Sequence, residues 1–298
     1  METDLGTALP KPDWLKVKAV ERPEFADVRD TLRTLNVRTV CDPSHCPNRC
    51  ECWSSGTATF LMLGGVCTRG CRFCSVPKGA KGDEISSDEP ERIAEAVAKL
   101  GLRHVVITSV TRDDLADHGS DQYASVVRAV HERSPRCAVE LLVPDLGGSR
   151  ERLGTILTAG PEVLGHNIET VERATHSIRD GRASYSTSLK LLAMSKEISP
   201  GTLTKSSIMV GLGESRDELC QAMDDLREAE VDMLTVGQYL RPSKAQVEVS
   251  RYVTPEEFAD IARTAKEKGF RHVSSGPFVR SSYRAAEAYE SIRGCNRC

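Results

Sequence analysis

The chain has 298 residues, of which 39% are hydrophobic and 28% charged, and its formal net charge at pH 7 is -3. This length is enough for one large barrel or two smaller domains, and the slightly acidic balance gives no electrostatic reason to expect nucleic acid as a partner. No apolar run approaches the roughly 20 residues of a membrane span, and the N-terminal METDLGTALPKPDW lacks the basic start and apolar centre of a signal peptide. We therefore expect a cytoplasmic protein that acts on neither nucleic acid nor membrane.

The predicted strands are seven short apolar runs rich in β-branched residues. No such run occurs before about residue 55, so we predict an N-terminal extension without strands. Because the runs are nearly continuous in their apolar character, they are typical of parallel strands buried on both faces. They span residues 57–64, 103–110, 138–144, 162–169, 205–213, 232–240 and 271–278.

Segments with helical periodicity lie between these runs. Residues 86–101 place Ile93, Val97 and Leu100 on one face, and residues 215–231 and 254–269 repeat the pattern. Strand and helix thus alternate, which is the rhythm of a βα barrel or of an open doubly wound sheet. In a barrel the active site lies at the carboxyl ends of the strands, and three cysteines follow the first predicted strand. We therefore predict an α/β fold with a barrel, complete or partial.

Seven of the 11 cysteines lie within residues 41–74. Cytosolic thiols stay reduced and the total is odd, so this density indicates metal binding or catalysis rather than disulfides. The upstream group is Cys41-x4-Cys46-x5-Cys52, with Cys50 inside it. Three thiolates can hold an iron–sulfur cluster, whose fourth ligand must then come from elsewhere in the chain.

The downstream group is Cys67-x3-Cys71-x2-Cys74. Three thiolates can each bind one iron of a [4Fe–4S] cluster and leave the fourth iron open, whereas a structural zinc site needs a fourth protein ligand that CTRGCRFC lacks. This spacing after the first barrel strand resembles the radical S-adenosylmethionine superfamily, in which the cofactor's methionine group chelates the open iron. Phe73 matches the aromatic residue often found before the third cysteine of that motif.

The two motifs in this order resemble the lipoyl synthase family. The resemblance extends over residues 14–283, through TSVTRDDLADHG (108–119), GHNIETV (165–171), KSSIMVGLGE (205–214), LTVGQYLRPS (234–243) and GPFVRSSY (276–283). It implies a partial (β/α)6 TIM-like barrel of the radical SAM type over residues 56–278. Residues 1–55 would be an extension that carries auxiliary cluster ligands, and residues 279–298 an extension that supplies a serine ligand.

The family resemblance also implies the activity. The enzyme would use S-adenosylmethionine and two [4Fe–4S] clusters to insert sulfur at carbons 6 and 8 of an octanoyl chain, which is amide-linked to a lysine of a lipoyl carrier domain. That carrier is the E2 component of a 2-oxoacid dehydrogenase or the glycine cleavage H protein. An electron donor and an iron–sulfur carrier that rebuilds the spent cluster are the other implied partners. The chemistry is consistent, because unactivated methylene groups offer no acid–base handle and require a radical.

Residue roles follow from the same resemblance. The cluster that cleaves S-adenosylmethionine would be held by Cys67, Cys71 and Cys74. The auxiliary cluster, which donates sulfur, would be held by Cys41, Cys46, Cys52 and the second serine of RSSY, Ser282. Since a serine oxygen is a harder ligand than a thiolate, its iron should be easier to release when the cluster is taken apart.

Candidate contacts to S-adenosylmethionine lie near the predicted strand ends. Asn167 and Glu169 could bind the polar groups of the cofactor or cap the following helix. Glycines after a strand provide close backbone approach, although they commonly serve the turn alone. The candidates are Phe73, Ser109, Asn167, Glu169, Gly211 and Gly213. We expect lone cations such as Arg112 and Lys205 to be solvated at the surface.

Some residues depart from the family pattern. His45 and Cys50 could compete as ligands or be ordinary loop residues, and the terminal Cys295-x2-Cys298 has ligand or redox spacing but is equally an accessory thiol pair. We interpret His104 and His272 as structural residues at the barrel end opposite the site.

Two alternative functions remain at this point. One is another two-cluster radical enzyme, such as a methylthiotransferase acting on RNA or protein, which normally carries an appended nucleic-acid module that we do not find. The other is an iron–sulfur carrier without catalysis, which would need neither a barrel lumen nor an open iron.

Overall fold

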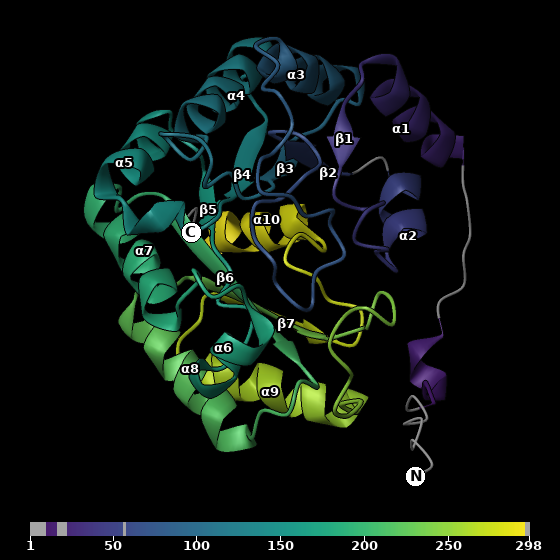
Figure 1. The fold of residues 1–298 in the computed structure, drawn as a ribbon, viewed down its shortest axis with the longest axis vertical. Coiled ribbons are helices and arrows are strands. Elements are labelled where there is room, and N and C mark those ends of the chain that lie inside the picture. Colours follow the sequence, from purple (N-terminus) through teal and green to yellow (C-terminus); the bar gives the residue numbers. More distant parts are fainter. Residues whose placement is uncertain (1–9, 17–22, 56–57, 296–298) are drawn as a thin grey trace.

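The strands of the computed structural model, which describes residues 10–16, 23–55 and 58–295, form one sheet whose neighbours follow chain order (Figure 1). Strands β2 to β8 are parallel, and β1 is antiparallel to β2. Within the described residues β8 pairs with β7 alone, so the barrel is partial. The strands are β1 Arg38–Thr39, β2 Thr59–Met62, β3 His104–Ser109, β4 Ala138–Leu142, β5 Val163–Gly165, β6 Leu203–Val210, β7 Met233–Gln238 and β8 His272–Gly276.

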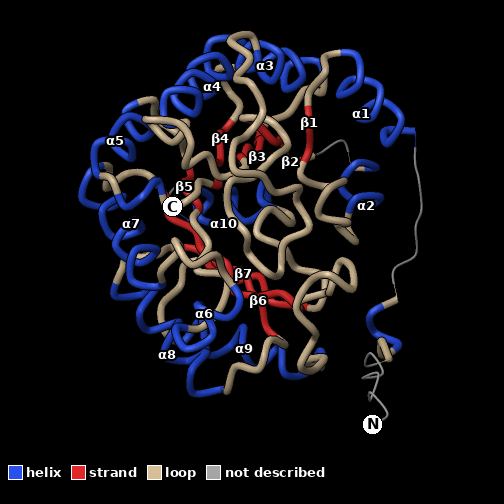
Figure 2. The backbone as a smooth tube through the Cα atoms, in the orientation of Figure 1, coloured by secondary structure: helices blue, strands red, loops and turns tan. Residues whose placement is uncertain are grey.

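The register brings the carboxyl ends of the strands to one edge of the sheet. Met62 of β2 pairs with Ser109 of β3, and Leu142 of β4 pairs with Gly165 of β5. The loops that follow these ends gather over the centre of the ring of strands, as the tan segments of Figure 2 show. All seven predicted strands are confirmed.

Helices cover the outer face of the sheet, and six βα units run from β2 to α9 before β8 ends the series. Capping boxes start α8 at Ser215 and α9 at Thr254, each reciprocated by a glutamate three residues on. The helices are α1 Pro23–Thr34, α2 Arg49–Ser54, α3 Glu89–Lys99, α4 Ser120–Arg133, α5 Arg150–Thr158, α6 Glu172–Ile178, α7 Tyr185–Ile198, α8 Arg216–Glu228, α9 Pro255–Glu267 and α10 Ala285–Cys295, with short 3-10 turns at Asp13–Leu15 and Leu146–Gly148. None of the described helices is both long and apolar enough to cross a membrane.

Helix α10 lies against the amino-terminal end of the barrel, behind the centre of the ring in Figure 1. Its Tyr289 packs with residues at the starts of β4, β5 and β7 and stacks near His104, at 5.4 Å between ring centroids. His272 Nδ1 lies 3.0 Å from Ser291 Oγ of the same helix. Both histidines therefore lie at the barrel end away from the cysteines, as predicted.

The prediction that the N-terminal extension has no strand is wrong. Arg38 and Thr39 form β1 and pair with Leu61 and Phe60 of β2. A two-residue strand has no apolar run from which it could be recognised. Its effect is to cover the free edge of β2, which would otherwise expose unpaired backbone groups.

Two cations predicted to be solvated are buried instead. Arg112 is 1% exposed, and its Nε donates to Asp114 Oδ1 at 2.8 Å. Lys205 of β6 is 3% exposed, and its Nζ lies 2.7 Å from Oε1 of Glu140 on β4. Each is buried because a carboxylate compensates its charge, and the partner of Lys205 is 65 positions away in sequence.

Candidate active site

A cavity of about 540 Å³ opens at the carboxyl ends of the strands. Ser109, Leu142 and Gln238, each the last residue of its strand, line it. Cysteines of both groups reach the same space together with the predicted serine ligand, namely Cys41, Cys46, Cys67, Cys71, Cys74 and Ser282. Residues from positions far apart in sequence therefore converge on a single cavity.

The downstream cysteine loop follows β2 and is closed by its own backbone. Cys67 N donates to Pro77 O at 2.8 Å, and Gly79 N donates to Cys67 O at 3.0 Å. The backbone N–H of Asp180, from the loop after α6, lies 3.3 Å from Cys71 Sγ. This contact orients the sulfur and would favour a thiolate at that position.

Burial dominates the ionisation of the downstream thiols. It raises the pKa of Cys74 to about 11, and the nearby Cys71 and Cys67 raise it further. Burial also raises the pKa of Cys71, which is again influenced by Cys67. Three thiols that perturb one another lie close together, and removing their protons requires a positive partner such as a metal.

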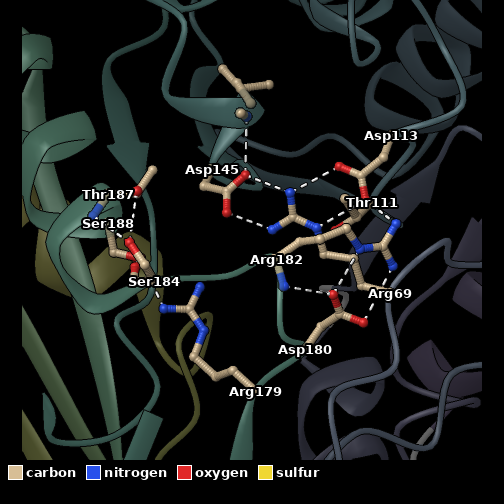
Figure 3. A network of polar contacts seen from close by, with 12 residues as sticks. Arg69, Thr111, Asp113, Asp145, Arg179, Asp180, Arg182, Ser184, Thr187 and Ser188 are labelled. Atoms are coloured by element: carbon tan, nitrogen blue, oxygen red, sulfur yellow. Dashed lines mark hydrogen bonds and ion pairs between the residues drawn. The ribbon is translucent and has the colours of Figure 1, made fainter. Parts of the chain in front are cut away.

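An arginine between Cys67 and Cys71 fastens this loop to the barrel (Figure 3). Arg69 is 7% exposed, and its Nη2 lies 2.7 Å from Asp145 Oδ1 and 2.8 Å from Asp113 Oδ1. Burial opposes ionisation of Arg69, but the hydrogen bonds to the two carboxylates outweigh it and raise the pKa of the guanidinium. The loop is thus held at the ends of β3 and β4.

Arg182 extends the same network from the other side. Its Nη1 lies 3.2 Å from Asp113 Oδ2 and its Nε 2.8 Å from Asp180 Oδ1, and it also donates to the carbonyl of Thr68 inside the cysteine loop. Asp180 Oδ2 in turn accepts from Gly70 N at 2.6 Å. Figure 3 shows these side chains pointing toward one another, so the cysteine loop is restrained from two directions.

The upstream cysteines form a second cluster of thiols. Cys46 N donates to Cys41 O at 3.0 Å, and Cys52 follows on α2. Burial, together with smaller contributions from Cys46 and Cys41, raises the pKa of Cys52 to about 12. The three upstream thiols therefore perturb one another, as the downstream three do.

Cys50 faces a different way from Cys52. The two residues are separated by two positions on α2, and side chains at that spacing do not share a helical face. Cys50 and Cys52 both pack against the hydrophobic core and neither lines the cavity, whereas His45 is exposed and does line it. The nine described cysteines form no disulfide, and the side chains of Cys295 and Cys298 lie outside the described part of the chain.

The segment after β8 brings Ser282 to the upstream cysteines. Ser282 Oγ accepts a hydrogen bond of 2.8 Å from Thr59 Oγ1. Asn48 Nδ2 donates to Phe278 O at 2.7 Å, and Tyr283 Oη donates to Glu51 Oε1 at 2.9 Å. Three contacts thus join the C-terminal segment to residues around the upstream cysteines.

Arg280 places a guanidinium on the cavity wall beside Cys46. It is half-buried, its Nη1 donates to Val279 O at 2.7 Å, and among the described residues it forms no ion pair with a carboxylate. Burial lowers its pKa, and Cys46 is the neighbouring group that opposes this effect. A cation without an acidic partner suits a cavity that receives negative charge.

Four predicted cofactor contacts line the cavity, namely Phe73, Ser109, Asn167 and Glu169. Asn167 Nδ2 donates to Glu169 Oε1 at 3.1 Å, and burial raises the pKa of Glu169. Glu169 has a positive φ of 69°, an unfavourable backbone conformation for a non-glycine residue that aims its carboxyl into the cavity.

The other two predicted contacts, Gly211 and Gly213, are not part of the cavity wall. Their φ values of 92° and 95° belong to the turn after β6. A Cβ on Gly211 would also lie 2.2 Å from Gln238 Nε2, so both the backbone conformation and the packing of the turn require glycine.

The two thiol groups suit clusters better than single ions. Among the described residues, no three His, Cys, Asp or Glu side chains converge on a point as the ligands of one metal ion would. In a cubane each thiolate binds a different iron, so the sulfurs surround the cluster rather than meet at one atom. Upstream, three thiols and a serine hydroxyl could hold a cluster as four ligands; downstream, the three thiols line the cavity.

The chain is similar to known proteins along most of its length. The sequence model of the radical SAM superfamily matches residues 61–226. The lipoyl synthase of Pyrobaculum calidifontis is 52% identical over 280 residues, which are 93% of this chain and 96% of the relative. The lipoyl synthase of Methanocella arvoryzae is 49% identical over 95% of this chain and 96% of its own length, and that of Staphylococcus epidermidis 50% identical over 96% and 94%.

Solved structures share the fold at low sequence identity. The crystal structure of methylornithine synthase has a TM-score of 0.56 at 15% identity, over 84% of this chain and 74% of that chain. The crystal structure of HydG, a maturase of the [FeFe]-hydrogenase, has a TM-score of 0.58 at 14% identity, over 78% of this chain and 55% of that chain. These two similarities show the α/β partial barrel.

Proposed function

Because the chain belongs to the lipoyl synthase family of the radical SAM superfamily, we propose that sulfur is inserted in the cavity at the carboxyl end of its barrel. The protein is an enzyme of this family, uses S-adenosylmethionine and two [4Fe–4S] clusters, and acts on an octanoylated carrier. The observation that carries the proposal is that cysteines of both groups line one cavity together with Ser282, namely Cys41, Cys46, Cys67, Cys71 and Cys74.

We assign Cys67, Cys71 and Cys74 to the cluster that binds the cofactor. When bound there, this cluster supplies the electron that cleaves the sulfonium of S-adenosylmethionine. Arg69 holds the cysteine loop against the ends of β3 and β4, which keeps the three sulfurs in a fixed arrangement. Phe73, Ser109, Asn167 and Glu169 lie where they can contact the cofactor.

We assign Cys41, Cys46, Cys52 and Ser282 to the auxiliary cluster, the sulfur source. Arg280 beside Cys46 offsets the negative charge that the thiolates bring into the cavity. The Ser282 oxygen would be the hardest of the four ligands, so the iron that it would bind should be the easiest to release.

The octanoyl chain requires an apolar path to both clusters. Apolar side chains of the cavity wall provide one, namely Leu61, Val110, Val143, Ile208, Met209 and Leu240. A chain of unactivated methylenes gains free energy from leaving water for such a surface. A cavity of this kind also shields a radical from solvent.

The carrier is the E2 component of a 2-oxoacid dehydrogenase or the glycine cleavage H protein. The other partners are an electron donor and an iron–sulfur carrier. The enzyme binds neither nucleic acid nor membrane, and it works in the cytoplasm. Functionally the chain divides into residues 1–55 with auxiliary ligands, the barrel at residues 56–278, and residues 279–298 with the serine ligand.

The test is a reaction under anaerobic conditions. Protein with both clusters is incubated with S-adenosylmethionine, a low-potential reductant and an octanoylated carrier domain. We expect 5′-deoxyadenosine and a carrier that has gained two sulfur atoms. Formation of 5′-deoxyadenosine without thiolation of the carrier would contradict the assigned substrate, and absence of 5′-deoxyadenosine would contradict the assigned chemistry.

A further inference from the structure

Thr59 contacts both parts of the upstream ligand set. Its hydroxyl donates to Ser282 Oγ at 2.8 Å, although the two residues are 223 positions apart. Its backbone carbonyl accepts a hydrogen bond of 3.1 Å from the N–H of Val40, the residue directly before Cys41. Thr59 lines the cavity with both Cys41 and Ser282 and is 8% exposed.

We propose that Thr59 is a positioning residue that holds the Ser282 oxygen toward Cys41 and Cys46 for cluster binding. The proposal rests on the assignment of Ser282 as a ligand made above. The other contacts of the C-terminal segment do not perform this task, because Asn48 holds the backbone at Phe278 and Glu51 holds the side chain of Tyr283. Within the described part of the chain, the hydrogen bond from Thr59 is the side-chain contact that reaches the ligand oxygen itself.

The two side chains suit these roles. Threonine is β-branched, and its place on a buried strand restricts χ1, so its hydroxyl is a rigid donor. Serine has a small side chain with three staggered rotamers, and a hydrogen bond to Oγ selects one of them. A serine oxygen bound to iron carries negative charge, which strengthens a hydrogen bond donated to it.

A packing role alone would have other consequences. If Thr59 served only to fill space at the start of β2, an isosteric valine would preserve the site. If its hydroxyl positions Ser282, valine and alanine would both weaken the serine–iron contact, while serine at position 59 would retain it. The spectrum of the auxiliary cluster separates these cases, because it reports the ligand of the unique iron.

The experiment uses full-length protein in which Cys67, Cys71 and Cys74 are alanine, so that only the auxiliary cluster is loaded. Into this background we introduce Thr59→Val, Thr59→Ala, Thr59→Ser and Ser282→Ala. The matched control is Thr235→Val, since Thr235 is 2% exposed on β7 and its hydroxyl has no hydrogen-bond partner among the described residues. We measure the electron paramagnetic resonance spectrum of the reduced cluster and the rate at which iron is released to a chelator.

We expect Thr59→Val and Thr59→Ala to release iron about tenfold faster than the parent, the factor typical of losing one hydrogen bond to a charged group. Their spectra should shift toward that of Ser282→Ala. Thr59→Ser and Thr235→Val should match the parent in both measurements.

Two results would overturn the proposal, and they are distinguishable. If Ser282→Ala changes the spectrum but Thr59→Val and Thr59→Ala behave like Thr235→Val, the ligand assignment stands and the role of Thr59 is refuted. If Ser282→Ala has the same spectrum and the same rate of iron release as the parent, the ligand assignment is refuted, and the proposed role of Thr59 is refuted with it. Should neither hydroxyl-free variant load a cluster, release from Thr59→Ser decides: a tenfold faster rate contradicts the proposal and the parent rate supports it.

Discussion

Arg69 and Asp145 are joined at two points, with Nη1 2.5 Å from Oδ2 and Nη2 2.7 Å from Oδ1. Both side chains are buried, and Arg69 lies between two cysteines of the downstream group. The bidentate geometry fixes the orientation of the guanidinium plane as well as its distance. The loop that carries the cysteines is therefore positioned by a residue that follows β4.

Replacing Arg69 by glutamine should reveal this dependence. The change leaves the buried carboxylate of Asp145 uncompensated, and losing one partner of such a pair costs about 3–5 kcal/mol of unfolding free energy. We also expect loss of iron from the downstream site and at least tenfold less cofactor cleavage. Chemical denaturation and iron analysis measure the two effects.

The control for this prediction is Arg150→Gln. Arg150 forms an ion pair with Glu197 that is more than half exposed on both sides, so its loss should change the unfolding free energy by less than about 1 kcal/mol. Equal effects of the two substitutions would show that the Arg69 network does not hold the loop.

Cys50 and Cys52 provide a matched pair of substitutions on one helix. Cys52→Ala should abolish loading of the auxiliary cluster, because Cys52 lies with Cys41 and Cys46. Cys50→Ala should leave the iron content unchanged, because Cys50 does not share the helical face of Cys52 on α2. Iron and sulfide analysis of anaerobically prepared protein checks both, and loss of iron from the Cys50 variant would reassign the ligands.

Ser282→Ala should separate the two half-reactions. Formation of 5′-deoxyadenosine depends on the downstream cysteines and should fall by less than about threefold, whereas sulfur insertion should fall by more than tenfold. Both products are quantified from the same reaction. An equal decrease in the two would mean that Ser282 supports the whole cavity rather than the sulfur source.

The buried pair of Glu140 and Lys205 should make stability depend on pH. Although burial opposes ionisation, Lys205 and His104 hold the pKa of Glu140 at about 2. Since this is below the ordinary value of 4.5, the ionised carboxylate stabilises the fold fully above that pH, and the contribution is lost as pH falls toward 2. Unfolding free energies measured across this range should decrease with falling pH.

Variants of the same pair provide the check. At neutral pH, Glu140→Gln should be destabilised by about 3–5 kcal/mol because it strands a buried ammonium, and adding Lys205→Met should recover much of the loss. No recovery in the double variant would show that the pair is not coupled.

Strands such as β2 and β7 could be predicted because each is a local apolar run whose residues are all buried, whereas every residue of β8 is half-buried. The two-residue β1 could not be, since its pairing depends on β2 rather than on its own residues. Long-range polar contacts could not be predicted from the sequence for the same reason. The contacts of Lys205 with Glu140 and of Thr59 with Ser282 depend on the fold, and no spacing in the sequence indicates them.

Candidate site residues also divide into those that a local motif indicates and those whose place depends on the fold. Phe73 and Glu169 were found from motifs beside strand ends, and the structure brings them to the cavity. Gly211 resembled a cofactor contact because glycine after a strand serves turns and ligands alike, and its surroundings show a turn. Arg280 stands inside the RSSY motif, but the sequence does not indicate that its guanidinium lies on the cavity wall without a carboxylate partner among the described residues.

The central claim is that this cavity inserts sulfur into a carrier-bound octanoyl chain, and the intact mass of the carrier tests it most directly. After reaction with protein holding both clusters, we predict a carrier heavier by two sulfur atoms, and no such product from the Cys71→Ala or Cys46→Ala variants. An unchanged carrier mass in a reaction that still produces 5′-deoxyadenosine would contradict the account.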